Sequence, residues 1–91
     1  MNKTNKTAQK PPYTSLSVIK GLLAKYGIRQ DDFARCIGRA PSTVSKNLNG
    51  RGLFNANDLK NIRKFVNQKE ILYAKQRGIE PHNYNIDELL L

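Results

Sequence analysis

The residue types that usually carry catalysis are scarce in this chain of 91 residues, and they do not form a reacting set. Cys36 is the single cysteine and His82 the single histidine, which is too few for a thiolate metal cluster or a catalytic triad. Gly50-Arg51-Gly52 is too short for a glycine-rich phosphate loop and lacks the lysine of such a loop. We therefore expect no enzymatic activity, no metal site and no cofactor.

The clearest chemical feature of the chain is its positive charge. Lysine and arginine total 16 against 7 aspartate and glutamate residues, which gives a net charge of +9 and a pI near 10.0. The excess lies in residues 1–78, because residues 79–91 carry only acidic side chains besides His82. A basic body with ordinary apolar content suits a polyanionic partner, with nucleic acid first among them. The alternative is that the positive charge only aids solubility.

Length and apolar content narrow the class of protein. A chain of 91 residues corresponds to one domain. Its apolar runs, such as Leu89-Leu90-Leu91, are far shorter than a membrane span. No apolar stretch follows the basic N-terminus, as it would in a secretory signal. We therefore expect a cytoplasmic protein.

Helical periodicity runs through the chain without any strand-like alternation of four or more residues, which predicts an all-α fold. Residues 1–12 are polar and basic, and we expect a flexible arm there. Residues 13–78 should form the folded domain, and residues 79–91 an acidic, leucine-ending tail. The tail contains Asn85-Ile86-Asp87-Glu88, a capping pattern that is compatible with a last helical turn.

Three short helices are predicted in residues 14–50, each ended by a glycine. Thr14 or Ser15 can cap the first of them, and the other two should start near Gln30 and at Pro41. Their ends are expected at Gly27, Gly38 and Gly50. Pro41 suits the first position of a helix, because its missing N–H has no helical partner there. Apolar residues recur at three- and four-residue steps, so that each helix has one inner face.

The helical stretch after residue 54 can be divided in two ways. Asn55 and Asp58 form a capping pair for a fourth helix, and Asn67 with Glu70 repeats that pattern. We therefore split the stretch and place a fifth helix at residues 68–77. One continuous helix over residues 56–77 is the alternative.

The second and third helices meet the requirements of a tight helical pair. Ala34 is small enough for a close crossing, Gly38 tolerates the positive φ of a turn, and Val44 can anchor the following helix in the core. The spacing is Gln30-x3-Ala34-x3-Gly38-x5-Val44. This spacing is typical of a helix-turn-helix, although any tight helical hairpin has similar needs.

With its neighbours, this segment resembles the helix-turn-helix of the phage repressor and Cro family, the lambda-repressor-like or XRE-type domains. The resemblance depends on Ile28-Arg29-Gln30 through Gly38, on Ser42-Thr43-Val44-Ser45-Lys46 and on Leu48-Asn49-Gly50-Arg51. Five helices in residues 14–77 fit this family without insertions. The run Gly38-Arg39-Ala40-Pro41-Ser42-Thr43 is also similar to the Ner-like regulators of transposable phages.

The resemblance implies a sequence-specific regulator of transcription that binds double-stranded DNA, a repressor of the phage or mobile-element type in a bacterial cell or a phage-infected bacterium. Its recognition helix, at about residues 41–49, would lie in the major groove. The matching base-contacting positions are Ala40, Pro41, Ser42, Ser45, Lys46 and Asn49. The expected phosphate contacts are Gln30, Arg39, Thr43, Asn47 and Arg51, together with Lys3, Lys6 and Lys10 of the arm.

Three residues depart from the family pattern. Arg39 stands where an aliphatic turn residue is usual. Arg29 and Ala40 stand where Ser or Thr usually caps the two helices, so both starts should be weakly capped.

The partners that follow from the resemblance are double-stranded DNA and a second copy of the chain, paired through the fifth helix or the tail. The acidic tail also fits a protein partner. A small phage or plasmid adaptor protein is therefore an alternative. RNA binding is another, although the chain lacks the exposed aromatic platform that single-stranded recognition usually needs.

Overall fold

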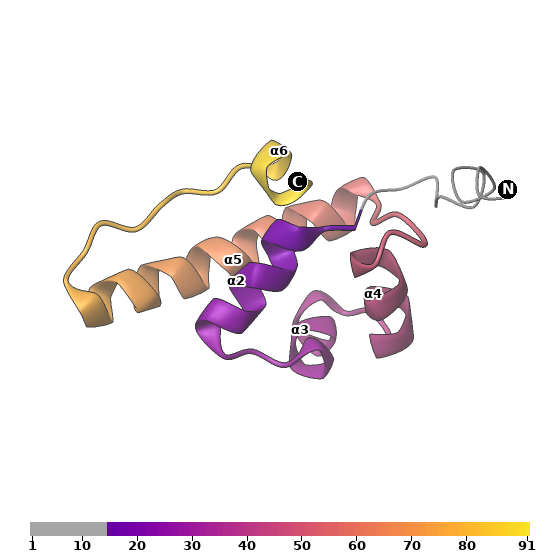
Figure 1. Cartoon of the computed structure of the whole chain (residues 1–91), viewed down its shortest axis with the longest axis horizontal. Coiled ribbons are helices and arrows are strands. Elements are labelled where there is room, and N and C mark those ends of the chain that lie inside the picture. Colours follow the sequence, from indigo (N-terminus) through magenta and orange to yellow (C-terminus); the bar gives the residue numbers. More distant parts are fainter. Residues whose placement is uncertain (1–14) are drawn as a thin grey trace, which may run out of the picture.

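The computed structural model describes residues 15–91, and these residues form five helices and no strand (Figure 1). In chain order the helices are α2 (Ser17–Tyr26), α3 (Gln30–Ile37), α4 (Pro41–Leu48), α5 (Ala56–Arg77) and α6 (Ile86–Leu89). The all-α prediction is confirmed for this part of the chain. Within it, none of the helices combines the length and the apolar character that a membrane crossing requires. The predicted arm, residues 1–12, lies outside the described residues.

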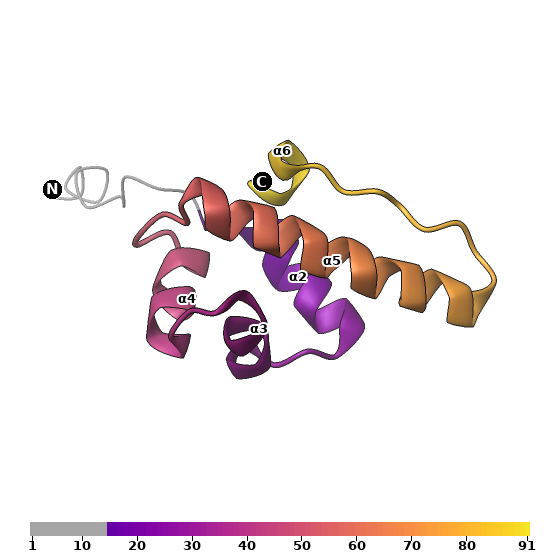
Figure 2. The ribbon, with the colours of Figure 1, turned by 180° about the vertical axis from the view of Figure 1, so that it is seen from behind.

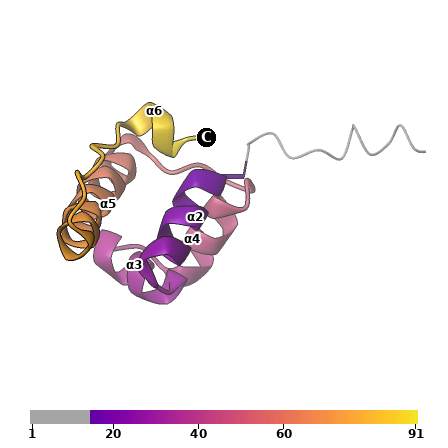
Figure 3. The same cartoon turned by 60° about the vertical axis from the view of Figure 1, so that its left-hand side comes forward.

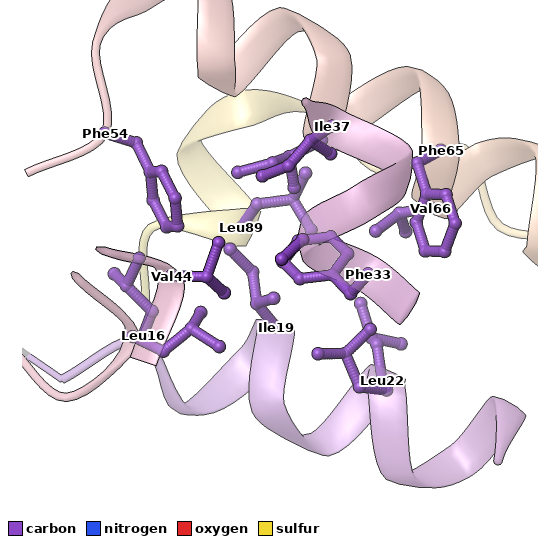
Figure 4. Packing of buried hydrophobic residues seen from close by; sticks show 14 residues of the cluster. Leu16, Ile19, Leu22, Phe33, Ile37, Val44, Phe54, Phe65, Val66 and Leu89 are labelled. Carbon is purple, nitrogen blue, oxygen red and sulfur yellow. The ribbon is translucent and has the colours of Figure 1, made fainter. Parts of the chain in front are cut away.

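One hydrophobic core joins the helices (Figure 4). Ile19, Phe33, Val44 and Ile62, one from each of α2 to α5, are fully buried in it. The Phe33 ring packs on that of Phe65, with ring centroids 5.3 Å apart. The helices α2 and α3 each contact both α4 and α5. In Figure 3 α5 lies at the left of the molecule and α4, beside α2, at the right.

The start of α2 is held by distant parts of the chain. The predicted cap from Ser15 is wrong, because its hydroxyl donates to the Leu48 carbonyl at 3.2 Å instead. The Leu16 N–H donates to the same carbonyl at 2.9 Å, and the Val18 N–H to the carbonyl of Leu91 at 3.1 Å. These are the N–H groups that a helix start leaves without internal partners. Thus α2 begins where α4 and α6 end.

The predicted division of the long helix is wrong, because α5 is continuous from Ala56 to Arg77. Four helices, not five, therefore lie in residues 15–77. The start of α5 is as expected: the Asp58 N–H donates to Asn55 Oδ1 at 2.7 Å, and the Asn55 N–H donates to the Asp58 carboxylate at 3.2 Å. Asn67 and Glu70 do not repeat this box, because both bind the chain that follows α5.

That chain, residues 79–85, is called the strap here. It turns back after α5 and runs along this helix to α6 (Figures 1 and 2). Asn67 pairs with the backbone of Tyr84, donating to its carbonyl at 3.0 Å and accepting from its N–H at 2.8 Å. Asn85 caps α6 as predicted, and Leu89 of α6 is buried in the common core. Residues 79–91 are therefore part of the folded domain rather than a separate tail.

The buried carboxylate of Glu70 joins α5 to α2 and to the strap. It accepts from the Tyr26 hydroxyl at 2.7 Å, from Lys25 Nζ at 3.1 Å and from the His82 N–H at 3.2 Å. Burial by itself would raise the pKa of Glu70, but these donors and the charge of Lys25 hold it below its ordinary value. Burial and the bond to Glu70 raise the pKa of Tyr26. A charged carboxylate and a neutral phenol therefore belong to the folded state.

Candidate nucleic-acid interface

The outer face of α4 gathers side chains that donate hydrogen bonds. Val44 and Leu48 are fully buried, so the opposite side of α4 faces solvent. A shallow hollow on that side is lined by Ser42, Ser45, Lys46, Asn49 and Arg51. Ala40 and Pro41 are exposed at the start of the same helix. The predicted base-contacting residues thus share one surface, and Arg51 of the predicted phosphate set joins them.

Lys20 of α2 adds a cation to this surface that the sequence analysis missed. Its Nζ donates to Asn49 Oδ1 at 3.1 Å, while Asn49 Nδ2 donates to the Ser45 carbonyl at 2.9 Å. These two bonds fix the orientation of the Asn49 amide beside the exposed Lys46. No spacing rule links Lys20 to residues of α4, because their contact depends on how α2 and α4 cross.

The turn between α3 and α4 sets how the two helices cross. Gly38 has φ +72°, a left-handed conformation that favours glycine. Its N–H donates to the Arg35 carbonyl at 3.2 Å, and the Arg39 N–H donates to the Ala34 carbonyl at 2.9 Å. Ala34 is fully buried, as a close crossing requires. The roles predicted for Ala34 and Gly38 are confirmed.

Both α3 and α4 begin without a side-chain cap, as Arg29 and Ala40 predicted. Free N–H groups in a first helical turn are suited to bind an anion. The start of α3 also carries Asp31 and Asp32, whose charge opposes a phosphate, whereas the first turn of α4 has no acid. The start of α4 is therefore the better of the two positions for a phosphate.

Gln30 and Thr43 lie in these first turns. Each is half-buried, Gln30 in α3 and Thr43 in α4, so part of each side chain reaches solvent. Both side chains are therefore accessible to a partner at the helix starts.

Asn47, another predicted phosphate contact, lies on the inner side of α4. Its side chain is only 3% exposed, and Nδ2 donates to the Leu53 carbonyl at 3.3 Å. Gly52 lies so close that a Cβ atom there would collide with the Asn47 amide oxygen. Asn47 therefore holds the loop after α4, and the prediction that it contacts phosphate is wrong.

Arg39 turns toward α5. Its Nε lies 3.7 Å from the buried carboxylate of Asp58, and its side chain is 38% exposed. The guanidinium offsets the charge of a carboxylate that belongs to the capping box of α5. The first role of Arg39 is thus to tie the turn between α3 and α4 to the start of α5, which its place in the turn does not predict.

The remaining phosphate candidates, Lys3, Lys6 and Lys10, lie outside the described residues. Comparison of the chain with protein families, with curated proteins and with solved structures gave no significant match.

Proposed function

We propose that this protein is a sequence-specific regulator of transcription that binds double-stranded DNA through α3 and α4, which act as a helix-turn-helix of the lambda-repressor-like type. The observation that carries the proposal is the outer face of α4, where Ser42, Ser45 and Lys46 meet on an exposed surface. Lys46 is suited to donate to guanine O6 or N7, and the serine hydroxyls suit either kind of base edge. In this proposal α4 lies in the major groove.

Phosphate contacts around the groove complete the proposal. Arg51 and Lys20 border the outer face of α4, and the uncapped first turn of α4 offers N–H groups to a phosphate. Gln30, at the start of α3, is proposed to contact the backbone on the other side. With no cofactor invoked, such a protein represses by occupying its site on DNA, in the manner of small phage and mobile-element repressors.

A homodimer on DNA is part of the proposal. Two-fold operators place half-sites about 34 Å apart, which needs a paired protein. The C-terminal half of α5 exposes Leu72, and the strap exposes Ile79 nearby in the sequence. Exposed apolar side chains of this size are suited to an interface between copies.

The test is selection of bound sequences from a random duplex library, which returns the operator and its symmetry. Lys46→Ala should then relax preference at one base pair, at a cost of about 1–3 kcal/mol for the correct base. Gln30→Ala should weaken binding to all sequences alike. Lys75→Ala, which removes the same charge from the far end of α5, is the control.

Salt dependence gives a second measurement on the same duplex. The logarithm of the binding constant should fall with the logarithm of the salt concentration, by a slope of about −0.9 for each phosphate neutralised. Binding that is equally tight to unrelated duplexes, or a base preference unchanged in Lys46→Ala, would refute the proposal.

A further inference from the structure

The solvent face of α5 carries positive charge without exposed acids. Its cations are Lys60, Arg63, Lys64, Lys69, Lys75 and Arg77. Its two carboxylates, Asp58 and Glu70, are each 3% exposed and are bound within the fold. Asp58 belongs to the capping box and lies beside Arg39, and Glu70 accepts bonds from Lys25, Tyr26 and His82. No carboxylate of this helix is therefore left to neutralise the exposed cations.

Three of these cations border a groove on the outer side of α5, called the α5 groove here. It is lined by Lys60, Arg63 and Lys64, by the amides of Asn61, Asn67, Gln68 and the strap residue Asn83, and by the apolar side chain of Ile71 at one end. Cationic and amide side chains are the groups that contact phosphate oxygens. No aromatic ring lines the groove, so it lacks the stacking platform of single-strand binders.

The α5 groove and the outer face of α4 face in different directions. The inner sides of the two helices, with Val44 and Leu48 on α4 and Ile62 and Val66 on α5, are fully buried in one core. Since the inner sides of α4 and α5 face this common core, their outer sides face away from it, and the two helices lie apart in Figure 3. A straight duplex on one of these faces leaves the other face free.

We infer that the α5 groove binds the phosphate backbone of a second double-stranded DNA segment, without base preference, so that one copy of the protein holds two segments together. Charge complementarity carries this inference, because the groove offers three cations and several amide donors and the exposed part of its helix offers no acid. The inference goes beyond base recognition by α4 and rests on the proposed function, because the first of the two segments is the one bound by α4.

The variant for the test is Lys60→Gln with Lys64→Gln in the full chain. Arg63 is left unchanged, because its Nε donates to the Tyr84 carbonyl at 3.0 Å and holds the strap. The matched control, Arg35→Gln with Arg77→Gln, removes the same charge from exposed positions outside the groove. Thermal unfolding of all three proteins checks that both double variants fold as the wild type does.

The readout is energy transfer between two short duplexes, one labelled with a donor and the other with an acceptor fluorophore. Wild type and control should bring the duplexes together. The groove variant should bind the second duplex roughly tenfold more weakly, with a salt slope for that step shallower by about 1.8, since two phosphates are no longer neutralised. With the duplexes in excess, dilution of the protein should lower the wild-type transfer in direct proportion to its concentration, as bridging by single copies requires.

Three results would overturn the inference. Unchanged transfer in the groove variant would assign bridging to pairs of protein copies. Equal loss in the control would assign it to net charge alone. Binding of polyglutamate or of phosphatidylserine vesicles at the groove, in place of duplex, would assign a protein or a membrane as the partner. Lys46→Ala separates the two proposals, because it alters base preference only if α4 reads DNA, whereas it leaves the residues of the α5 groove unchanged.

Discussion

The outer face of α4 and the strap contact of α5 use polar side chains in opposite ways. On α4, Ser42 and Lys46 are exposed, and the helix begins without a side-chain cap. On α5, three donors bind the buried carboxylate of Glu70, and the backbone of Tyr84 satisfies Asn67. Polar groups that are paired inside a fold hold its parts together, whereas exposed donors remain free for a partner. Glu70 and Asn67 therefore maintain this fold, whereas Ser42 and Lys46 are suited to binding.

The largest expected effect is that of Glu70→Ala. It leaves the Tyr26 hydroxyl and the His82 N–H without their acceptor, and we expect the free energy of unfolding to fall by about 3 kcal/mol. Urea denaturation measures the change. Asp32→Ala is the control, because its ion pair with Arg35 is exposed and should contribute less than about 1 kcal/mol. Similar losses in both variants would contradict the distinction between the two regions.

Asn47 and Asn49 give an intermediate effect within α4 itself. Asn47→Ala should lower the free energy of unfolding by about 1–2 kcal/mol, since the Leu53 carbonyl loses its buried donor. Asn49→Ala should change stability by less than about 0.5 kcal/mol and weaken binding to the selected operator. Denaturation and duplex titration of both variants measure the two effects. If Asn47→Ala instead weakened binding and Asn49→Ala lowered the free energy of unfolding, the loop after α4 would have to open when DNA binds.

The smallest expected effect is on the pH dependence of stability. The folded pKa of Glu70 lies below its ordinary value of 4.5, so its stabilisation is present above that pH and is lost as pH falls through the folded value. The raised pKa of Tyr26 acts at the other end, where stabilisation present below pH 10.0 is lost as pH rises. The free energy of unfolding, measured by urea titration at a series of pH values, should therefore show a plateau with one decline at acid pH and another at alkaline pH. Glu70→Gln should flatten the acid decline, and an unchanged acid limb would contradict this origin.

Local rules were sufficient for three of the helix starts and turns. Pro41, Gly38 and the pair Asn55–Asp58 each act on neighbouring backbone, and each has the predicted role. The pair Asn67–Glu70 has the same spacing as a capping box but binds the strap, because the preceding chain is already helical and a distant segment occupies both side chains. A capping pattern therefore predicts a helix start only where no tertiary partner competes for it.

The candidate site was predictable where helical periodicity alone decides exposure. Ser42, Ser45, Lys46 and Asn49 follow from the side of α4 opposite Val44. Asn47, Arg39 and Lys20 did not follow, because their environments depend on the path of the loop after α4 and on the positions of α5 and α2. The tail was misjudged for the same reason, since the burial of Leu89 depends on the return of the strap.

The bond from the Val18 N–H to the carbonyl of Leu91 also bears on how the protein is made. Synthesis proceeds from the N-terminus, so α2, α3 and α4 exist before Leu89 is available to fill the core beside Ile19 (Figure 4). Joining segments so far apart in sequence costs chain entropy before any contact compensates it, which slows this step of folding. During translation the helices therefore pass through an interval in which one side of their apolar core is open to the ribosome and its chaperones.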